Sequence, residues 1–252
     1  MYSFEGKVVW VTGSSTGIGR AVALGFAAHG ADVIVHCNQN LAEGESVAAE
    51  ISGMGREALL VQGDVSKKNI VESMVSKIND RFGRIDILVN NAGSMVKRVR
   101  LEQLDEETWD RILDVNLKSV FLVTQAALPL MKPQGKGRIV NVTSIAARNG
   151  GSIGALAYAT SKGGVSTLTR NLAKELLEYN ILVNGIAPGV ISTPFQDRFT
   201  PPETRQKLGN QILMGREGTP EEMVGAVLFL SSDYSNYITG EIIEINGGQL
   251  MD

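Results

Sequence analysis

The chain has 252 residues, long enough to bury a substantial hydrophobic core. Its 24 Lys and Arg residues against 27 Asp and Glu residues give a net charge of −3, and the basic residues are scattered, so the charge does not predict binding to nucleic acid or to an anionic membrane. The single cysteine, Cys37, excludes an internal disulfide and a cysteine-cluster metal site, and the two histidines, His29 and His36, are not spaced as metal ligands.

The chain begins MYSFEG and passes directly into an apolar run, without the charged and apolar segments of a signal peptide. No apolar run approaches the roughly eighteen residues that a membrane span requires. We therefore expect a cytoplasmic protein with no membrane partner.

Seven short apolar runs rich in β-branched residues recur along the chain. They are KVVWVT at 7–12, ADVIVHC at 31–37, EALLVQGD at 57–64, RIDILVNNAG at 84–93, GRIVNVTS at 137–144, ILVNGIAPG at 181–189 and GEIIEINGG at 240–248. Apolar runs without alternation are typical of strands buried on both faces. Segments of helical periodicity lie between them, over 70–82, about 107–131 and 158–179. This alternation predicts an α/β fold, a parallel sheet with helices on both faces, in one domain spanning 1–252.

A glycine-rich stretch, VTGSSTGIG, follows the first predicted strand and opens a helix, with Gly13, Gly17 and Gly19 at the turn. Glycines let the backbone approach a pyrophosphate, whose charge then meets the unpaired N–H groups of the helix N-terminus. The spacing G-x-x-x-G-x-G differs from the usual dinucleotide fingerprint, and a plain tight turn is the alternative. Asp64 and the run 90–93 stand at the carboxyl ends of later strands, where such sheets bind ligands, and favour the dinucleotide interpretation.

The stretch YATSK sets Tyr158 four residues before Lys162 on the opening turn of a predicted helix, so the phenol and the ammonium share a helix face. A free tyrosine has a pKa of about 10 and transfers protons poorly at neutral pH, whereas a nearby positive charge favours the phenolate. On these five residues alone, a half-exposed helix with a solvated lysine is the better interpretation.

Five motifs decide between these interpretations. TGSSTGIG, NNAG, NVTS, YATSK and the PG at 188–189 occur in this order across nearly the whole chain, which thereby resembles the short-chain dehydrogenase/reductase family. The resemblance implies a single Rossmann-type domain with a doubly wound, seven-stranded parallel sheet, a nicotinamide dinucleotide cofactor and usually a homotetramer. It maps the catalytic set of the family onto Asn116, Ser144, Tyr158 and Lys162.

The resemblance also assigns roles to these four residues. Tyr158 exchanges a proton with the substrate oxygen while hydride passes between the carbinol carbon and nicotinamide, and Lys162 lowers the pKa of Tyr158 and hydrogen-bonds the nicotinamide ribose. Ser144 holds the substrate oxygen, and Asn116 holds a water that links Lys162 to solvent. Considered singly, Ser144 is typical of a strand-end cap and Asn116 of a satisfied core residue.

The expected cofactor-binding residues follow the same motifs. They are Gly13, Ser14, Ser15, Thr16, Gly17, Ile18, Gly19, Cys37, Asn38, Asp64, Val65, Asn91, Ala92, Gly93, Tyr158, Lys162, Pro188, Gly189, Ile191 and Thr193. Asp64 and Val65 are expected to border the adenine, and Thr193 the carboxamide.

The preference between the two nicotinamide dinucleotides depends on the end of the second strand. The family places there an acidic residue that selects NAD, and this position falls on Cys37, so nothing there repels a 2′-phosphate. The basic residue that usually binds this phosphate is missing at Thr16 and at Asn38. With Ser14, Ser15 and Asn38 as possible donors, the sequence favours NADP(H) over NAD(H).

Residues 191–219 mix prolines, charges and apolar side chains, and we expect them to form a mobile substrate lid; an ordinary surface excursion is the alternative. The candidate substrate-pocket residues are Ser94, Met95, Ala146, Arg148 and Phe195. Reductases that act on acyl-carrier proteins tend to place basic residues at the end of the helix after the catalytic lysine. Glu178 and Tyr179 stand there instead and weigh against such a partner.

The leading hypothesis is an NAD(P)(H)-dependent oxidoreductase that interconverts a carbonyl and a secondary alcohol on a small ketone, sugar or polyol. The alternatives are a 3-oxoacyl-thioester reductase, a non-catalytic dinucleotide-binding module, and an enzyme that uses the cofactor for epimerisation or dehydration. Homotetramer formation is expected from the resemblance alone.

Overall fold

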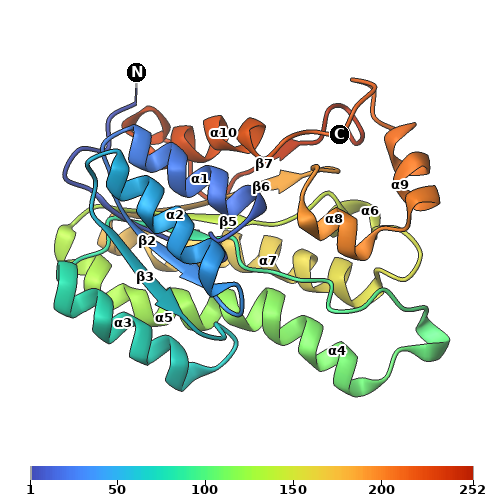
Figure 1. The fold of residues 1–252 in the computed structure, drawn as a ribbon, viewed down its shortest axis with the longest axis horizontal. Coiled ribbons are helices and arrows are strands. Elements are labelled where there is room, and N and C mark those ends of the chain that lie inside the picture. Colours follow the sequence, from blue (N-terminus) through green and yellow to red (C-terminus); the bar gives the residue numbers. More distant parts are fainter. Residues whose placement is uncertain (1, 252) are drawn as a thin grey trace.

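The structure, a computed structural model, describes residues 2–251. Seven strands form one parallel sheet in the order β3-β2-β1-β4-β5-β6-β7 (Figure 1). Their bounds are β1 Val8–Val11, β2 Asp32–Cys37, β3 Ala58–Gln62, β4 Ile87–Asn90, β5 Gly137–Val142, β6 Ile181–Pro188 and β7 Ile242–Ile245. Each predicted run contains one of these strands, and the doubly wound parallel sheet is confirmed.

Helices cover both faces of the sheet. The α-helices are α1 Gly17–Ala28, α2 Leu41–Gly53, α3 Lys68–Phe82, α4 Glu106–Leu113, α5 Ser119–Met131, α6 Ala146–Asn149, α7 Leu156–Glu175, α8 Pro194–Phe199, α9 Pro202–Gly209 and α10 Glu221–Ser231. The shorter turns are η1 Leu101–Gln103, η2 Asp114–Lys118, η3 Lys132–Gln134, η4 Leu177–Tyr179 and η5 Asp233–Ser235. Helices α1, α2 and α10 pack on one face, and α3, α5 and α7 on the other (Figure 1).

The central strand β1 shows why the strand runs lack alternation. Val9 and Val11 belong to the core under α1, α2 and α10, whereas Val8 and Trp10 belong to the core under α3, α5 and α7. Successive side chains point to opposite faces, and both faces are covered, so every position is apolar.

The predicted long helix over 107–131 consists of three parts. Asp105 caps α4 by accepting a hydrogen bond from the Thr108 N–H at 2.7 Å. The π-helical turn η2 separates α4 from α5, and in it the Ser119 N–H donates to the carbonyl of Asp114, five residues back. Such single π-turns are frequent at functional sites, and a hydrophobic pattern does not reveal them.

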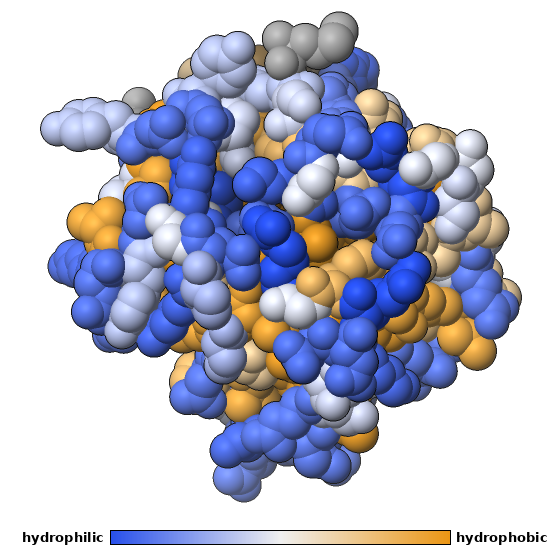
Figure 2. Space-filling model, turned by 90° about the vertical axis from the view of Figure 1, so that its left-hand side faces the viewer, coloured by the Kyte–Doolittle hydropathy of each residue, from blue (hydrophilic) through white to orange (hydrophobic). Residues whose placement is uncertain are grey.

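The sheet order places a ligand crevice between β1 and β4. The chain leaves β1 towards β2 and β3, and then returns to the other side of β1 as β4, so the loops after β1 and β4 diverge at their carboxyl ends. Helices α8 and α9 lie beyond this end of the sheet (Figure 1). Figure 2 shows the side of the molecule at the left of Figure 1, away from these helices. Hydrophilic residues cover most of this side, and hydrophobic residues show between them and towards the lower right of the view.

The expected lid contains α8 and α9 and then returns to the sheet. The Ser192 N–H donates to Gly218 O at 2.8 Å, and the Gly218 N–H donates to Val190 O at 3.0 Å. Arg205 of α9 binds Glu217 and Asp197 through its guanidinium. The segment is therefore tied down at its base, and its mobility stays a prediction. Each helix described within residues 2–251 is too short or too polar to cross a bilayer.

Candidate active site

The glycine loop after β1 packs directly against the loop after β4. Gly13 and Gly17 have φ of +64° and +55°, a backbone region that favours glycine. A Cβ on Gly13 would lie 2.9 Å from Ala92 Cα, and a Cβ on Gly19 would overlap Gly13 O. Glycine is therefore required at position 13 by both conformation and close backbone contact, at position 17 by conformation, and at position 19 by close backbone contact.

The N-terminus of α1 is open to an anion. The Thr16 side chain, at the N-cap, makes no capping hydrogen bond, and the first turn contains no acidic residue. The positive end of the helix dipole and its first N–H groups thus face the crevice without an acidic neighbour on the helix itself, an arrangement that fits a pyrophosphate. Ser15 is buried, whereas Thr16, Gly17 and Ile18 are half-buried at this turn.

His36, on β2, supports the loop in a way that sequence reasoning missed. The Gly13 N–H donates to His36 Nδ1 at 2.8 Å, so the ring proton lies on Nε2, which donates to Gly63 O at 2.9 Å. Burial lowers the pKa of His36, and this outweighs the hydrogen bond to Gly63 and the charge of Asp64, which raise it. The neutral ring therefore holds the loop against the end of β3. A histidine within a strand of apolar residues is the sequence feature that could have indicated this role.

Ser14 is a structural residue and not the free donor that the sequence suggested. Its side chain donates to Val11 O at 2.8 Å and accepts from the His36 N–H at 2.9 Å, and the residue has no exposed surface. The hydroxyl is used within the fold, which removes one of the expected contacts to a 2′-phosphate.

The end of β2 carries a buried thiol close to negative charge. Cys37 is 1% exposed and its sulfur packs towards Gly44 of α2, while Asn38 is exposed. Burial raises the pKa of Cys37, and the charges of Glu43 and Glu45 raise it further. The two carboxylates of α2 thus act on the thiol, whereas the end of β2 itself carries no acidic residue at Cys37 or Asn38.

Asn91 fastens the β4 loop to the β1 loop. Its side-chain amide donates to Thr12 O at 2.9 Å and to Gly13 O at 3.0 Å. The backbone N–H groups of Asn91 and Ala92 both donate to the Thr12 hydroxyl at 3.0 Å. The NNAG motif thus shapes the crevice, and Thr12 is a supporting residue that the motifs did not reveal.

The expected adenine edge consists of Asp64 and Val65. Burial raises the pKa of Asp64, but hydrogen bonds from Ser66 and the charge of Arg111 outweigh it, so the carboxyl pKa is lowered. Val65 is 5% exposed, with its side chain in the core under α3 and α5. A ligand at this edge would therefore meet the Asp64 carboxylate and the Val65 backbone.

Tyr158 and Ser144 meet at the carboxyl end of β5. A hydrogen bond joins the Ser144 hydroxyl to the Tyr158 phenol, and Ser144 Oγ also accepts from the Ala146 N–H at 3.1 Å. Burial raises the pKa of Tyr158 to about 12, and the Ser144 hydrogen bond lowers it less. The phenol is protonated at neutral pH.

Lys162 lies beside Tyr158, as the shared helix face predicts. Its Nζ is 5.9 Å from the Tyr158 ring centroid and donates to Val142 O at 2.7 Å. Burial lowers the pKa of Lys162 to about 8. The expected lowering of the Tyr158 pKa is not found, because burial dominates both groups and the ammonium points to the Val142 carbonyl.

Asn116, in the π-turn η2, is completely buried and its side chain is satisfied. Nδ2 donates to Ser94 O at 2.6 Å and to Ile112 O at 2.8 Å, and Oδ1 accepts from the Ser94 N–H at 3.0 Å. Gly93 separates Asn116 from Lys162, since a Cβ on Gly93 would lie 2.8 Å from Asn116 Oδ1 and 3.4 Å from Lys162 Nζ. The structure therefore brings the four predicted catalytic residues into one region.

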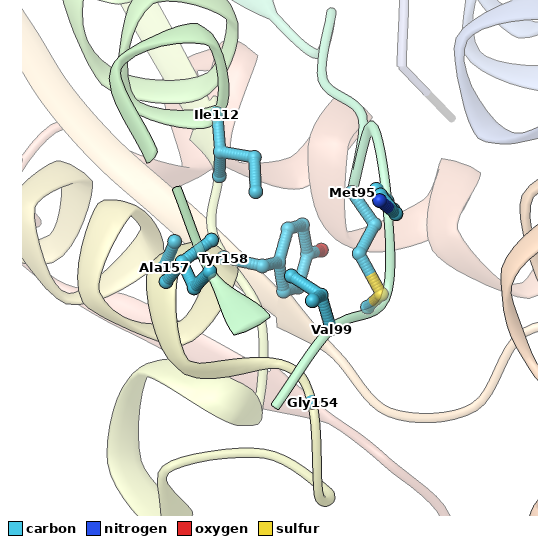
Figure 3. Close-up of a pocket in the computed structure, with 8 residues that line it drawn as sticks. Met95, Val99, Ile112, Gly154, Ala157 and Tyr158 are labelled. Atoms are coloured by element: carbon cyan, nitrogen blue, oxygen red, sulfur yellow. The ribbon is translucent and has the colours of Figure 1, made fainter. Parts of the chain in front are cut away.

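The candidate substrate residues divide into two groups. The Tyr158 ring lies between Ile112 and Val99, with Met95 on the neighbouring loop (Figure 3). Phe195 of α8 lies against Tyr158 with ring centroids 5.6 Å apart. Met95 and Phe195 are thus near the phenol.

The other candidates are engaged in the fold. Arg148 is paired with Glu244 of β7 at 3.3 Å, so the expected anion receptor already has a carboxylate. Ser94 binds Asn116 through its backbone, and its hydroxyl accepts from the N–H of Val96, whose φ of +57° is rare for a β-branched residue. Ala146 contributes its N–H to Ser144.

The PG loop at the end of β6 completes the crevice. Pro188 O accepts from the Ile145 N–H at 3.0 Å, which places this loop beside Ser144. A Cβ on Gly189 would lie 2.8 Å from Asn246 Cα, and the Ile191 side chain is buried. Thr193 contacts the glycine loop at Gly17, where a Cβ would lie 3.3 Å from Thr193 Cγ2.

Comparisons with known proteins show the family of the chain. A family model described as "Enoyl-(Acyl carrier protein) reductase" matches residues 13–249. The chain is 42% identical to the 3-oxoacyl-(acyl-carrier-protein) reductase FabG of Thermotoga maritima, over 97% of this chain and 98% of the relative. It is 37% identical to the 2-dehydro-3-deoxy-D-gluconate 5-dehydrogenase of Escherichia coli, over 99% and 97%.

A solved short-chain type dehydrogenase/reductase from Mycobacterium marinum superposes with a TM-score of 0.93 at 36% identity, covering 99% of this chain and 98% of that one. The ordered motifs, the seven-stranded sheet and the Ser144–Tyr158–Lys162 cluster are consistent with this match. The chain belongs to the short-chain dehydrogenase/reductase family, and is an NAD(P)(H)-dependent oxidoreductase that acts on carbonyl and alcohol groups.

Proposed function

We propose that the chain reduces the carbonyl of a small ketone, sugar or polyol-type substrate, or oxidises the corresponding alcohol, with Tyr158 as the proton-transfer residue. The observation that carries this proposal is the cluster in which Ser144 hydrogen-bonds the Tyr158 phenol while Lys162 lies 5.9 Å from its ring. When bound, the nicotinamide supplies or accepts the hydride.

Each of the three residues has a separate task. The protonated phenol of Tyr158 donates its proton to the carbonyl oxygen in the reductive direction, and Ser144 donates a hydrogen bond to the same oxygen. The charge of Lys162, which is present below its pKa of about 8, stabilises the phenolate that forms as the proton leaves. Asn116 holds the Ser94 backbone beside this cluster.

The glycine loop, Asp64 and the PG loop would hold the dinucleotide, and we propose one domain that carries both cofactor and catalysis, with residues 191–219 as the lid. The open N-terminus of α1 and the Gly13–Ala92 contact support the first part. The Phe195–Tyr158 contact supports the second, because α8 covers the phenol.

A 3-oxoacyl thioester is the second candidate substrate, favoured by the 42% identity to a reductase of that class. Glu178 and Tyr179 form η4 at the end of α7 and weigh against an acidic carrier protein. However, Lys132 Nζ lies 3.7 Å from the Tyr179 ring centroid, so this surface does carry positive charge. A substrate panel therefore needs both classes.

Replacement of Tyr158 by Phe tests the reaction. Loss of the hydroxyl removes the proton donor, and we expect kcat for carbonyl reduction to fall by about 10² to 10⁴. The assay follows NADPH and NADH absorbance against ketones, sugars and 3-oxoacyl thioesters. Tyr179→Phe, a tyrosine outside the cluster, serves as the matched control and should keep wild-type activity. Undiminished turnover in Tyr158→Phe would refute the assignment, and cofactor binding without consumption of any substrate would favour a binding module.

NADP(H) is our proposed cofactor, since no acidic residue ends β2 and the exposed Asn38 follows Cys37. Glu43 and Glu45 act in the opposite direction. Asn38→Asp would add a carboxylate beside the expected 2′ position, and we expect the ratio of kcat/KM for NADPH to that for NADH to fall about tenfold. Asn38→Ser is the neutral control. An unchanged ratio in Asn38→Asp would show that the 2′ group lies elsewhere.

Titration of Lys162 gives a stability prediction with a definite sign. Burial lowers its pKa from the ordinary 10.5 to about 8, so between these values the unfolded chain binds more protons and stability rises with pH. The free energy of unfolding of the wild type should therefore gain about 3 kcal/mol relative to Lys162→Met as the pH rises from 8 to 10.5. Denaturant unfolding of both proteins at each pH measures the difference, and a constant difference would contradict the burial of the charge.

We also propose a homotetramer, by family resemblance, and a cytoplasmic location. Two features of the described residues support an assembly. β7 is an edge strand of the sheet, and Tyr234 and Tyr237, which precede it, are 69% and 105% exposed. Edge strands and exposed aromatic side chains are available for contact with another subunit. Light scattering should give four times the chain mass of 27.0 kDa, and a monomeric mass would refute the assembly.

A further inference from the structure

Arg111 of α4 closes a ring of polar contacts with the expected adenine edge. Its Nη2 lies 2.9 Å from Asp64 Oδ2, and its Nη1 donates to Ser66 Oγ at 2.8 Å. The Ser66 N–H and hydroxyl both donate to Asp64 Oδ1, at 2.9 and 2.7 Å. The guanidinium therefore fixes the Asp64 carboxylate through two partners at once, and neither the motifs nor their spacing singled it out.

The residue that follows Arg111 belongs to the catalytic cluster. Ile112 O accepts a hydrogen bond from Asn116 Nδ2 at 2.8 Å, and the Ile112 side chain lines the same pocket as Tyr158 (Figure 3). Asn116 in turn holds both backbone groups of Ser94. One peptide unit of α4 thus separates the Asp64 contact from the carbonyl that holds Asn116 and from a side chain that lines the pocket beside Tyr158.

We propose that Arg111 is a positioning residue. It couples ligand binding at Asp64 to the position of α4 and η2 beside the catalytic cluster. The proposal rests on the proposed function, because it requires the adenine of a dinucleotide at Asp64. An adenine that orders the carboxylate also orders Arg111, and this restrains Ile112 and Asn116. Because such coupling is reciprocal, an α4 that is already held in place also strengthens adenine binding.

A purely structural role is the alternative. The Arg111 and Asp64 side chains are 36% and 24% exposed, and exposed ion pairs contribute little to stability. In that case Arg111 would only fasten α4 to the loop after β3, and ligand binding at Asp64 would leave the exchange of α4 unaltered. Measurement of local order at α4 with a ligand that lacks nicotinamide separates these roles, because no chemistry is involved.

Hydrogen–deuterium exchange with ADP-ribose, and with its 2′-phosphate form, provides this measurement. In the wild type at saturation, we expect amide exchange to slow about fivefold over residues 106–118 as well as in the glycine loop 13–19. Nicotinamide mononucleotide, which lacks adenine, should leave residues 106–118 unprotected. In Arg111→Ala at its own saturating concentration, protection of 106–118 should disappear while protection of 13–19 remains.

Two further variants complete the test. Arg111→Lys keeps the charge but has a single nitrogen for two partners, and should give intermediate protection. Arg81→Ala, which removes an exposed arginine of α3 paired with Glu57 at 2.9 Å, should behave as the wild type.

Three outcomes would overturn the coupling. They are full protection of 106–118 in Arg111→Ala, wild-type protection confined to 13–19, and equal loss of protection in Arg81→Ala. Protection in neither segment of the wild type would refute the dinucleotide site of the proposed function itself, and the coupling with it.

Discussion

The contact between the loops after β1 and β4 is the constraint on which the site depends. Gly13 packs within van der Waals distance of Ala92, and Asn91 and Thr12 join the two loops by hydrogen bonds. This junction stands where the strand order reverses, so it determines both the path of the glycine loop into α1 and the position of Gly93 beside Lys162. A larger residue at position 13 or 19 would separate the two halves of the crevice.

Burial determines the electrostatics of the candidate catalytic cluster. The ammonium of Lys162 is held by one backbone carbonyl, and desolvation lowers its pKa while it raises that of Tyr158. Proximity of a cation to a phenol therefore does not by itself give a low phenol pKa, since both groups lose water together. The Tyr158 phenol is therefore protonated at neutral pH, and in the proposed reaction it donates this proton while the charge of Lys162 stabilises the phenolate that forms.

The polar side chains around the crevice mainly hydrogen-bond to backbone groups of the neighbouring loops. His36 accepts from the glycine loop, Ser14 donates to Val11 of β1 and accepts from His36 of β2, and Asn116 binds the Ser94 backbone. Buried polar groups need partners, and here the partners are the loops that the site requires to be rigid. Arg111 extends the same principle across α4, from Asp64 to the peptide next to Asn116.

The sequence by itself determined the seven buried strands, the glycine turn and the shared face of Tyr158 and Lys162, because these depend on local patterns and on ordered motifs. Tertiary structure decided the rest. The hydrogen bond from the His36 N–H to Ser14 and the pairing of Arg148 with Glu244 join residues far apart in the sequence, and the hydrophobic pattern does not reveal the π-turn at Asn116 or the carboxylates near Cys37. The direction of the pKa shift of Tyr158 also depended on tertiary structure. Sequence spacing indicates that Tyr158 and Lys162 are neighbours, but it does not indicate how much solvent burial removes from them.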